Sequence, residues 1–323
     1  MTEQPATAAS LKHFPLPLFA AVLGIAGLGL AWREAGRVLG APALVGELLL
    51  LIAAIVFGLI AIAYLLKWQR YPAAVAAEFR HPVRSSFIFA ITVSLTLLSN
   101  ALLPHRPDPA GGLWLFATIA HLLLAGWLVR RLLLQPMPLA TLTPAIFIPL
   151  VGNILAPLAG VKLGYPALSW FSFSVGLGLW ITIQPLLLHR LFYGEALPPK
   201  LMPALAILLA PPSVGAMAFA SLQGGRFETP AWIMAGIAGF IALVLLSLLP
   251  RFARLPFAPS WWAYTFPSAA FALMLIQISA ARPAEAHAVT GWIALSAASV
   301  IVALVALRTI KAAIGGHLFK PEE

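Results

Sequence analysis

The sequence predicts an all-α polytopic membrane protein with ten transmembrane helices. Of its 323 residues, 61% are hydrophobic and only 9% are charged, a composition outside the range of soluble globular domains. Apolar runs long enough to cross a hydrocarbon core of about 30 Å recur along the whole chain. Short connectors with polar, Gly or Pro residues separate these runs. Residues 1–323 are therefore expected to form a single transmembrane domain.

Ten apolar runs qualify as spans, numbered in chain order. They comprise residues 16–31, 44–66, 86–103, 111–129, 142–159, 167–188, 202–222, 230–249, 261–280 and 288–307. The connector of residues 67–84 is longer than the others and reads KWQRYPAAVAAEFRHPVR. We expect it to form a cytoplasmic interfacial helix with its basic side toward lipid headgroups. A solvated linker with a helical turn is the alternative.

Positive charge is distributed unevenly between the two sides of the predicted bundle. Fourteen of the twenty Lys and Arg residues fall in the termini and in the connectors that follow even-numbered spans, and six fall on the other side. Because positively charged loops stay on the cytoplasmic side, both termini are predicted to be cytoplasmic. The expected location is the inner (plasma) membrane.

Several function classes lack the residues that they need. The net charge of +10 comes from basic residues that occur singly or in pairs, without a dense basic stripe, so we expect no nucleic-acid partner. Cysteine is absent, and the seven histidines show no metal-ligand spacing. The chain has no P-loop, HExxH or GxSxG motif. We therefore expect no enzyme activity, no metal and no cofactor.

Polar side chains concentrate in the odd-numbered spans. In hydrocarbon, Ser, Thr and Asn usually face other helices or water, so their spacing indicates the inward face of a helix. The second span, by contrast, has no Ser or Thr between Leu48 and Leu66. Odd-numbered helices are therefore predicted to face inward and even-numbered helices outward. The candidate pore-lining residues are Thr92, Thr96, Asn153, Pro157, Pro212, Ser213, Thr265 and Ala269.

The prolines inside spans follow the same division. Pro144 and Pro149 lie in the fifth span and Pro211 in the seventh, whereas the only clear interior case in an even-numbered span is Pro185. A proline bends a helix and frees a carbonyl, which neighbours, hydroxyls or water must satisfy. Kinked, hydroxyl-bearing helices around an axis indicate a lined conduit. Close helix packing, which also favours small residues and proline, is the alternative.

The interiors of the ten spans carry no acidic or basic residue; Glu47 lies near the start of the second span. Proton pumps and coupled transporters usually place ionisable groups at membrane depth, and many cation pores use acidic rings. A conduit without such groups, with basic residues at its cytoplasmic mouth, is compatible with anions. His121 in the fourth span is expected to be a hydrogen bonder between helices rather than a proton relay.

Five stretches resemble the TehA-type tellurite-resistance proteins, which are bacterial relatives of the plant slow anion channels and of the C4-dicarboxylate (malate) permeases. They are FPLP at 14–17 with LAW at 30–32, HPVR at 81–84 followed by SFI, QPLLLHR at 184–190, LAPPSV at 209–214 and WAYTFPSAA at 262–270. The resemblance is ordered along nearly the whole chain, from Phe14 to about Leu307.

The resemblance implies five helical hairpins, with the odd-numbered helices forming an inner ring around a central pore. It also implies a homotrimer with one pore in each protomer. In this family an aromatic side chain on the ninth span blocks the pore at mid-membrane, and by motif position the matching residue is Phe266. Pro267 is then the expected hinge of the gate, because its bend presents Phe266 to the pore. A phenylalanine that serves only for packing is the alternative.

Three functions compete. We predict a gated anion channel that conducts small monovalent anions. A secondary transporter or exporter of C4-dicarboxylates such as malate, or a tellurite-resistance permease, is the second possibility, although it would need an ionisable group at the midplane. A membrane scaffold or sensor without transport is the third. The partners expected are small inorganic or organic anions and the lipid bilayer.

Overall fold

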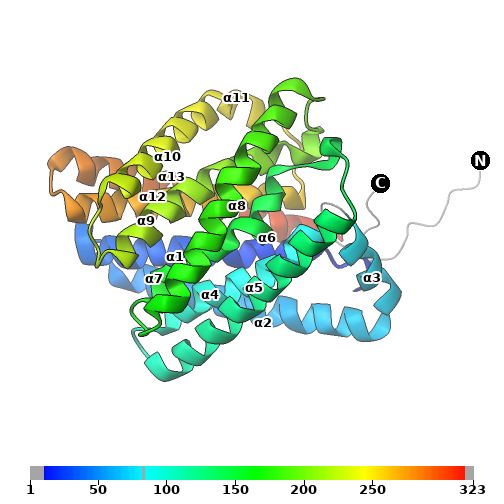
Figure 1. The fold of residues 1–323 in the computed structure, drawn as a ribbon, viewed down its shortest axis with the longest axis horizontal. Helices are drawn as coiled ribbons and strands as arrows, with labels where there is room; N and C mark the ends of the chain where they lie inside the picture. The colour runs from blue at the N-terminus through cyan, green and yellow to red at the C-terminus, as the bar shows by residue number, and fades with distance from the viewer. Residues whose placement is uncertain (1–10, 82–83, 317–323) are drawn as a thin grey trace, which may run out of the picture.

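The computed structural model describes residues 11–81 and 84–316, and every regular element within them is helical. The helices form a single bundle (Figure 1). Each even-numbered predicted span is one long helix: α2 (Ala43–Arg70), α5 (Pro107–Leu134), α8 (Pro166–Tyr193), α10 (Thr229–Ser247) and α13 (Glu285–Ile314).

Each odd-numbered predicted span instead begins with a 3-10 segment that continues into an α-helix. The pairs are η2 (Leu16–Leu18) with α1 (Phe19–Leu39), η3 (Arg84–Ile88) with α4 (Phe89–Leu102), η5 (Pro144–Ile146) with α6 (Phe147–Val151), η7 (Pro199–Leu209) with α9 (Ala210–Leu222), and η8 (Pro259–Tyr264) with α12 (Thr265–Ala281). Prolines explain part of this pattern, because they supply no N–H to the helical ladder and favour the first turn of a helix. A 3-10 segment within a longer helix often marks a hinge or a strained sequence.

The fifth span is the most broken. After α6 it continues as η6 (Gly152–Leu155) and α7 (Pro157–Gly160), and the whole stretch Pro144–Gly160 is shorter than the other apolar helices. Within the described residues, nine helices are long and apolar enough to cross a membrane, and they coincide with the other nine predicted spans.

Burial alternates along the chain. In the most apolar part of each helix, the first, third, seventh and ninth spans are 56 to 83% buried, whereas the even-numbered spans are 17 to 33% buried. Leu51 on α2 and Leu243 on α10, for example, are 57% and 66% exposed. In a membrane protein such large apolar surfaces are covered by lipid or by another subunit. The predicted division into inward and outward helices agrees with this burial.

The contacts between helices follow a regular scheme. Each odd-numbered span packs against the even-numbered span that follows it, as in α1 with α2, α4 with α5 and α12 with α13. The odd-numbered spans also contact one another in a closed order: α1 with α4, α4 with α6 and α7, α7 with α9, α9 with α12, and α12 with α1. The 3-10 segments at the starts of these spans contact one another in the same order, so the N-terminal ends of the five odd-numbered spans lie together.

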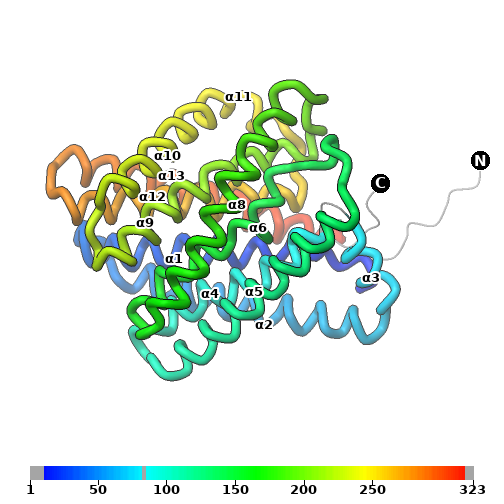
Figure 2. Tube along the Cα trace, in the orientation of Figure 1, coloured from blue at the N-terminus to red at the C-terminus, as the bar shows by residue number. Residues whose placement is uncertain are grey.

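Four short elements lie in the connections: η1 (Leu11–His13), α3 (Pro72–Arg80), η4 (Leu139–Thr141) and α11 (Leu249–Phe252). Of these, α3 follows a sharp turn of the chain at the end of α2, as Figure 2 shows. The connector of residues 67–84 thus contains a helix over Pro72–Arg80, and its place at a cytoplasmic membrane surface stays a prediction. Lys67 and Arg70 still belong to α2, and residues 82 and 83 lie outside the described residues.

Candidate functional site

A cavity of about 70 Å³ lies where the odd-numbered spans meet. It is named here the central cavity, and all of its lining residues belong to odd-numbered spans. They are Ala20, Leu23, Phe87, Val93, Phe147, Ile148, Val151, Gly152, Ile154, Leu155, Ile207, Ala210, Pro211, Val214, Trp262, Ala263, Phe266 and Pro267. The even-numbered helices contribute none of them.

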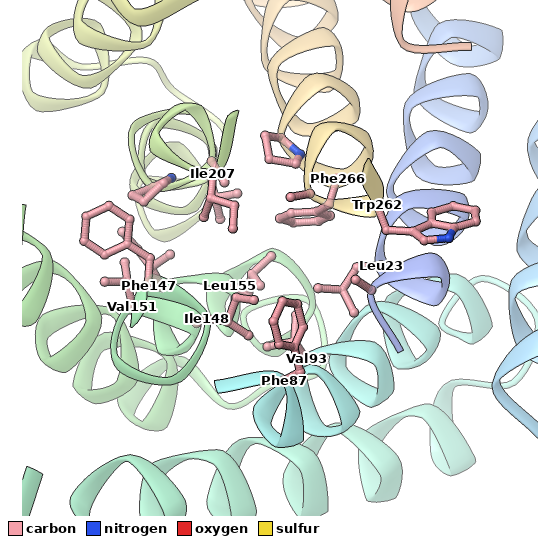
Figure 3. Close-up of a pocket in the computed structure, with 18 residues that line it drawn as sticks. Leu23, Phe87, Val93, Phe147, Ile148, Val151, Leu155, Ile207, Trp262 and Phe266 are labelled. Atoms are coloured by element: carbon pink, nitrogen blue, oxygen red, sulfur yellow. The ribbon is translucent and has the colours of Figure 1, made fainter. Parts of the chain in front are cut away.

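The central cavity lies at the level where the 3-10 segments become α-helices. Phe87 belongs to η3 and Ile207 to η7, two or three residues before the helices α4 and α9 begin. Figure 3 shows the ring of Phe266 extending from the first turn of α12, with Leu23 and Leu155 on other elements across the space. The five odd-numbered spans therefore present their helical transitions to one space.

Phe266 is half-buried, and its ring packs against α1. A Cβ atom added at Gly27 would lie 3.0 Å from Phe266 Cδ2 and 3.4 Å from Ala269 Cβ. One turn earlier, a Cβ atom at Gly24 would collide with the Thr265 hydroxyl. The two glycines allow α1 to approach the start of α12 closely, and Gly27 leaves the space that the Phe266 ring fills.

Hydroxyl groups donate to backbone carbonyls around the proline next to Phe266. Pro267 lies in the first turn of α12 and has no N–H to donate. Ser268 Oγ donates to Tyr264 O (2.7 Å) and to Thr265 O (2.9 Å), and Thr265 Oγ1 donates to Trp262 O (2.6 Å). The change from η8 to α12 is thus held by side-chain donors rather than by the backbone alone.

The lining of the central cavity is apolar, with no acidic or basic side chain. Among the lining residues, only Trp262 has a side-chain hydrogen-bond donor. Its indole N–H donates to Thr309 Oγ1 on α13 (3.0 Å). An apolar lining of this kind is unfavourable for hydrated ions, because it offers no polar group in place of their water. Within residues 11–81 and 84–316, no group of three or more His, Cys, Asp or Glu residues could hold a metal ion.

The predicted site residues fall into two groups. Phe266 and Pro267 line the central cavity. The other eight are buried but are not among its lining residues. Thr96 Oγ1 donates to Thr92 O (3.1 Å), and Ser213 Oγ donates to Leu209 O (2.7 Å). Their role in lining an open conduit therefore stays a prediction.

Asn153 differs from the hydroxyl residues. Its side chain is 3% exposed, and neither its Oδ1 nor its Nδ2 has a hydrogen-bond partner among the described residues. It lies in η6 beside Gly152 and Ile154, which both line the central cavity. Pro157, in α7, has its carbonyl bonded by Ser221 Oγ (3.0 Å).

His121 joins three spans behind the central cavity. Its Nδ1 lies 2.7 Å from Thr92 Oγ1, which connects α5 to α4. A Cβ atom at Gly152 would lie 2.7 Å from the His121 ring, so the fifth span packs directly on the imidazole. The prediction that His121 makes a hydrogen bond between helices is confirmed.

Most of the residues that line the central cavity could not be identified from their residue type. Leu23, Phe87 and Ile207 are apolar residues of the kinds that fill any helix interface, so nothing in their chemistry marks them. A positional signal was present, because three of the quoted motifs contribute to the lining. HPVR with SFI contains Phe87, LAPPSV contains Pro211, and WAYTFPSAA contains Phe266.

The chain matches the family model described as voltage-dependent anion channel (SLAC1) over residues 13–310. It is 32% identical over 266 residues to the tellurite resistance protein TehA homolog of Haemophilus influenzae, covering 81% of this chain and 80% of that protein. It is 28% identical over 322 residues to the S-type anion channel SLAH2 of Arabidopsis thaliana, covering 94% of this chain and 59% of that protein. For the guard cell S-type anion channel SLAC1 of the same plant, the identity is 26% over 290 residues, covering 84% of this chain and 51% of that protein. The chain thus spans little more than half the length of these two plant relatives. On the extent of the family match, it belongs to the SLAC1 family of voltage-dependent anion channels.

Proposed function

We propose that this protein is a gated anion channel whose path runs between the five odd-numbered spans. The observation that carries the proposal is the central cavity, which only those spans line. The closed order of contacts among the same spans supports an inner ring around this path. The relatives named as S-type anion channels support anions as the permeating species.

Phe266 is the proposed gate and Pro267 its hinge. A phenylalanine ring is large, rigid and apolar, so it both narrows the path and removes water from it. Movement of the ring would require a change at the junction of η8 and α12, where Pro267 weakens the backbone ladder. In this proposal, the ring packs beside Gly27 when the gate is closed, which the absence of a Cβ atom at Gly27 allows.

Selectivity would arise from the cost of dehydration rather than from a fixed cationic site. The lining offers hydrocarbon surface, so an anion that loses its hydration shell easily would pass more readily. A dianion such as malate would pass less readily, because the cost of transferring charge into a low-dielectric region rises steeply with charge. Small monovalent anions are therefore the proposed substrates.

A C4-dicarboxylate exporter or a tellurite-resistance permease is the alternative. The relative named as a tellurite resistance protein favours the tellurite-resistance permease, and no relative's name mentioned above favours the dicarboxylate exporter. A coupled transporter would be expected to carry an ionisable group at its midplane site, whereas the side chains that line the central cavity are apolar. The channel is therefore preferred. The protein is further proposed to form a homotrimer in the inner membrane, with both termini of each chain in the cytoplasm.

Current recording from purified protein in planar bilayers tests the gate. We expect the native chain to be nearly silent and Phe266→Ala to carry large, anion-selective currents. Phe271→Ala is the matched control, because Phe271 lies on the same helix and is not among the lining residues of the central cavity. Equal currents from the two variants would remove Phe266 from the gate. Saturable malate uptake into proteoliposomes without current in any variant would favour the exporter.

A further inference from the structure

Four buried polar side chains in and around the fifth span have no hydrogen-bond partner within the described part of the chain. They are named here the polar layer: Thr118 on α5, Asn153 in η6, and Ser169 and Ser172 on α8. Each is at most 3% exposed. The large majority of buried polar side-chain atoms in proteins are bonded to protein or to ordered water. Four exceptions on three elements that pack together therefore point to a ligand that these side chains share.

Contacts of α5 with the fifth span set the depth of Thr118. The Trp114 indole Nε1 donates to Ala156 O (3.0 Å), and a Cβ atom added at Gly152 would lie 2.7 Å from the His121 ring. Thr118 lies about one helical turn from both Trp114 and His121, so the three side chains share one face of α5. Thr118 therefore faces the fifth span between residues 152 and 156.

The helix α8 approaches the same stretch of the fifth span. A Cβ atom added at Gly160 would collide with Ser169 Oγ, and one added at Gly176 would lie 2.6 Å from Ile154 N. Ser172 lies about one turn from both Ser169 and Gly176. It therefore faces the fifth span between residues 154 and 160, at a depth that overlaps that of Thr118.

Asn153 contributes to the polar layer from the fifth span itself. Its neighbours Gly152 and Ile154 line the central cavity and Asn153 does not, so its amide lies on another side of the span. Pro157 has no N–H for the Asn153 carbonyl, which accepts from Ala156 N (3.2 Å) instead. Breaks of this kind persist in membrane helices where neighbouring side chains or water satisfy the freed polar groups.

The apolar core is interrupted at the same depth. Trp114, Ala156 and Ala159 form a buried apolar cluster that is separate from the main core. Thr118 follows Trp114 by one turn, and Asn153 precedes Ala156 by three residues. The polar layer therefore lies at the border between the two clusters, where apolar packing does not continue.

We propose that the polar layer binds water molecules that bridge α5, the fifth span and α8. Hydroxyl and carboxamide groups both donate and accept hydrogen bonds, and water matches them because it does the same. The four side chains carry no charge, so a buried ion among them would lack a charged partner. A buried water typically makes about three hydrogen bonds, so about two waters would satisfy the unpartnered atoms. This inference goes beyond the proposed channel and does not rest on conduction.

Thermal unfolding of the full chain in detergent tests whether the polar layer is satisfied. Thr118→Val and Ser172→Ala should each lower the thermal midpoint by about 2–4 °C, because hydrogen bonds to water are lost. In the double variant the second substitution should cost less than it does alone, since the two side chains share bridging water. The matched controls are Thr182→Val and Ser247→Ala, whose exposed hydroxyls donate to carbonyls of their own helices (2.7 and 2.6 Å) and whose loss should leave the midpoint unchanged.

The sign of the shift decides the outcome. Without a ligand, apolar replacements of the same shape would remove buried unpaired groups and raise the midpoint, which would overturn the proposal. Strictly additive losses would mean that Thr118 and Ser172 share no ligand and would overturn it as well.

X-ray radiolytic labelling of the native chain detects the water itself. Hydroxyl radicals form from bound water and oxidise the side chains beside it, including those shielded from bulk solvent. We expect oxidation of Trp114, which is 0% exposed and lies with Ser169 Oγ against Gly160, and little oxidation of Trp180, which is 6% exposed on α8. Thr118→Val combined with Ser172→Ala should reduce the oxidation of Trp114. Equal oxidation of the two tryptophans in the native chain would overturn the proposal.

Discussion

Replacing Gly27 by alanine should open the proposed gate without removing the gate residue. The added Cβ would lie 3.0 Å from Phe266 Cδ2 and 3.5 Å from Cε2. Ordinary carbon contacts begin at about 3.5 Å, so the ring must move by roughly half an ångström. Overpacking of this kind costs about 1–3 kcal/mol. Because about 1.4 kcal/mol is a factor of ten, the population with Phe266 displaced should rise roughly five- to 150-fold.

The assay is macroscopic current at fixed protein density in planar bilayers. Gly58→Ala on α2 is the matched control, because a Cβ atom there meets no heavy atom within 4 Å. Combining Gly27→Ala with Phe266→Ala gives a double-mutant cycle. The alanine at position 27 should add nothing once the ring is absent. The reasoning fails if folded Gly27→Ala is as silent as Gly58→Ala, or if its effect persists without the Phe266 ring.

Two further predictions concern selectivity and the buried ion pair of Lys67 and Glu78. In Phe266→Ala, nitrate should be more permeant than chloride and malate least permeant, since the apolar lining penalises strongly hydrated anions; reversal potentials measure the order, and a preference for malate would contradict it. Glu78→Gln should lower the free energy of unfolding by about 3–5 kcal/mol, because it leaves the buried Lys67 ammonium without its carboxylate. Lys67→Met combined with Glu78→Leu should recover most of that loss, and an unchanged thermal midpoint for Glu78→Gln alone would show that the pair contributes little.

The helix content, and which helices are the more buried ones, could be predicted from the sequence, because composition indicates the first and polar spacing the second. The ends of the helices were less predictable. The first span was expected to end at residue 31, but α1 continues to Leu39. Charged residues end the apolar run at this point, but they do not end the helix. Arg33 pairs with Glu47 (2.6 Å) and Arg37 with Glu34 (2.6 Å), so these charged side chains are accommodated on the continuing helix.

The polar stripes indicated the right helices but did not identify the residues of the central cavity. A hydroxyl group in hydrocarbon can satisfy itself on a carbonyl of the preceding turn, as Thr96, Ser213 and Thr265 do. A sequence gives no sign of whether a hydroxyl bonds backward or faces a conduit. The apolar lining residues cannot be recognised from the sequence either, because residues such as Leu155 or Ile207 could fill any helix interface.

The positions of the prolines predicted local structure better than the positions of the hydroxyl residues predicted the cavity lining. The concentration of prolines in the fifth, seventh and ninth spans predicted breaks in these helices, and these spans contain the 3-10 segments η5, η7 and η8, although the first and third spans also begin with such segments. The buried ion pair of Lys67 and Glu78, by contrast, could not be predicted. Lys67 and Glu78 are separated by the break between α2 and α3, and only the turn of the chain at Tyr71 brings their side chains together.

The most direct test of the proposed path is thiol block of the open channel, which is practical because the chain contains no cysteine. Leu155→Cys places a thiol in the central cavity of the Phe266→Ala variant, and Leu243→Cys places one on the outer surface of α10. A membrane-impermeant thiol reagent should abolish the current of the first double variant and leave that of the second unchanged. Current that persists after complete labelling of Leu155→Cys would mean that anions do not pass between the odd-numbered spans.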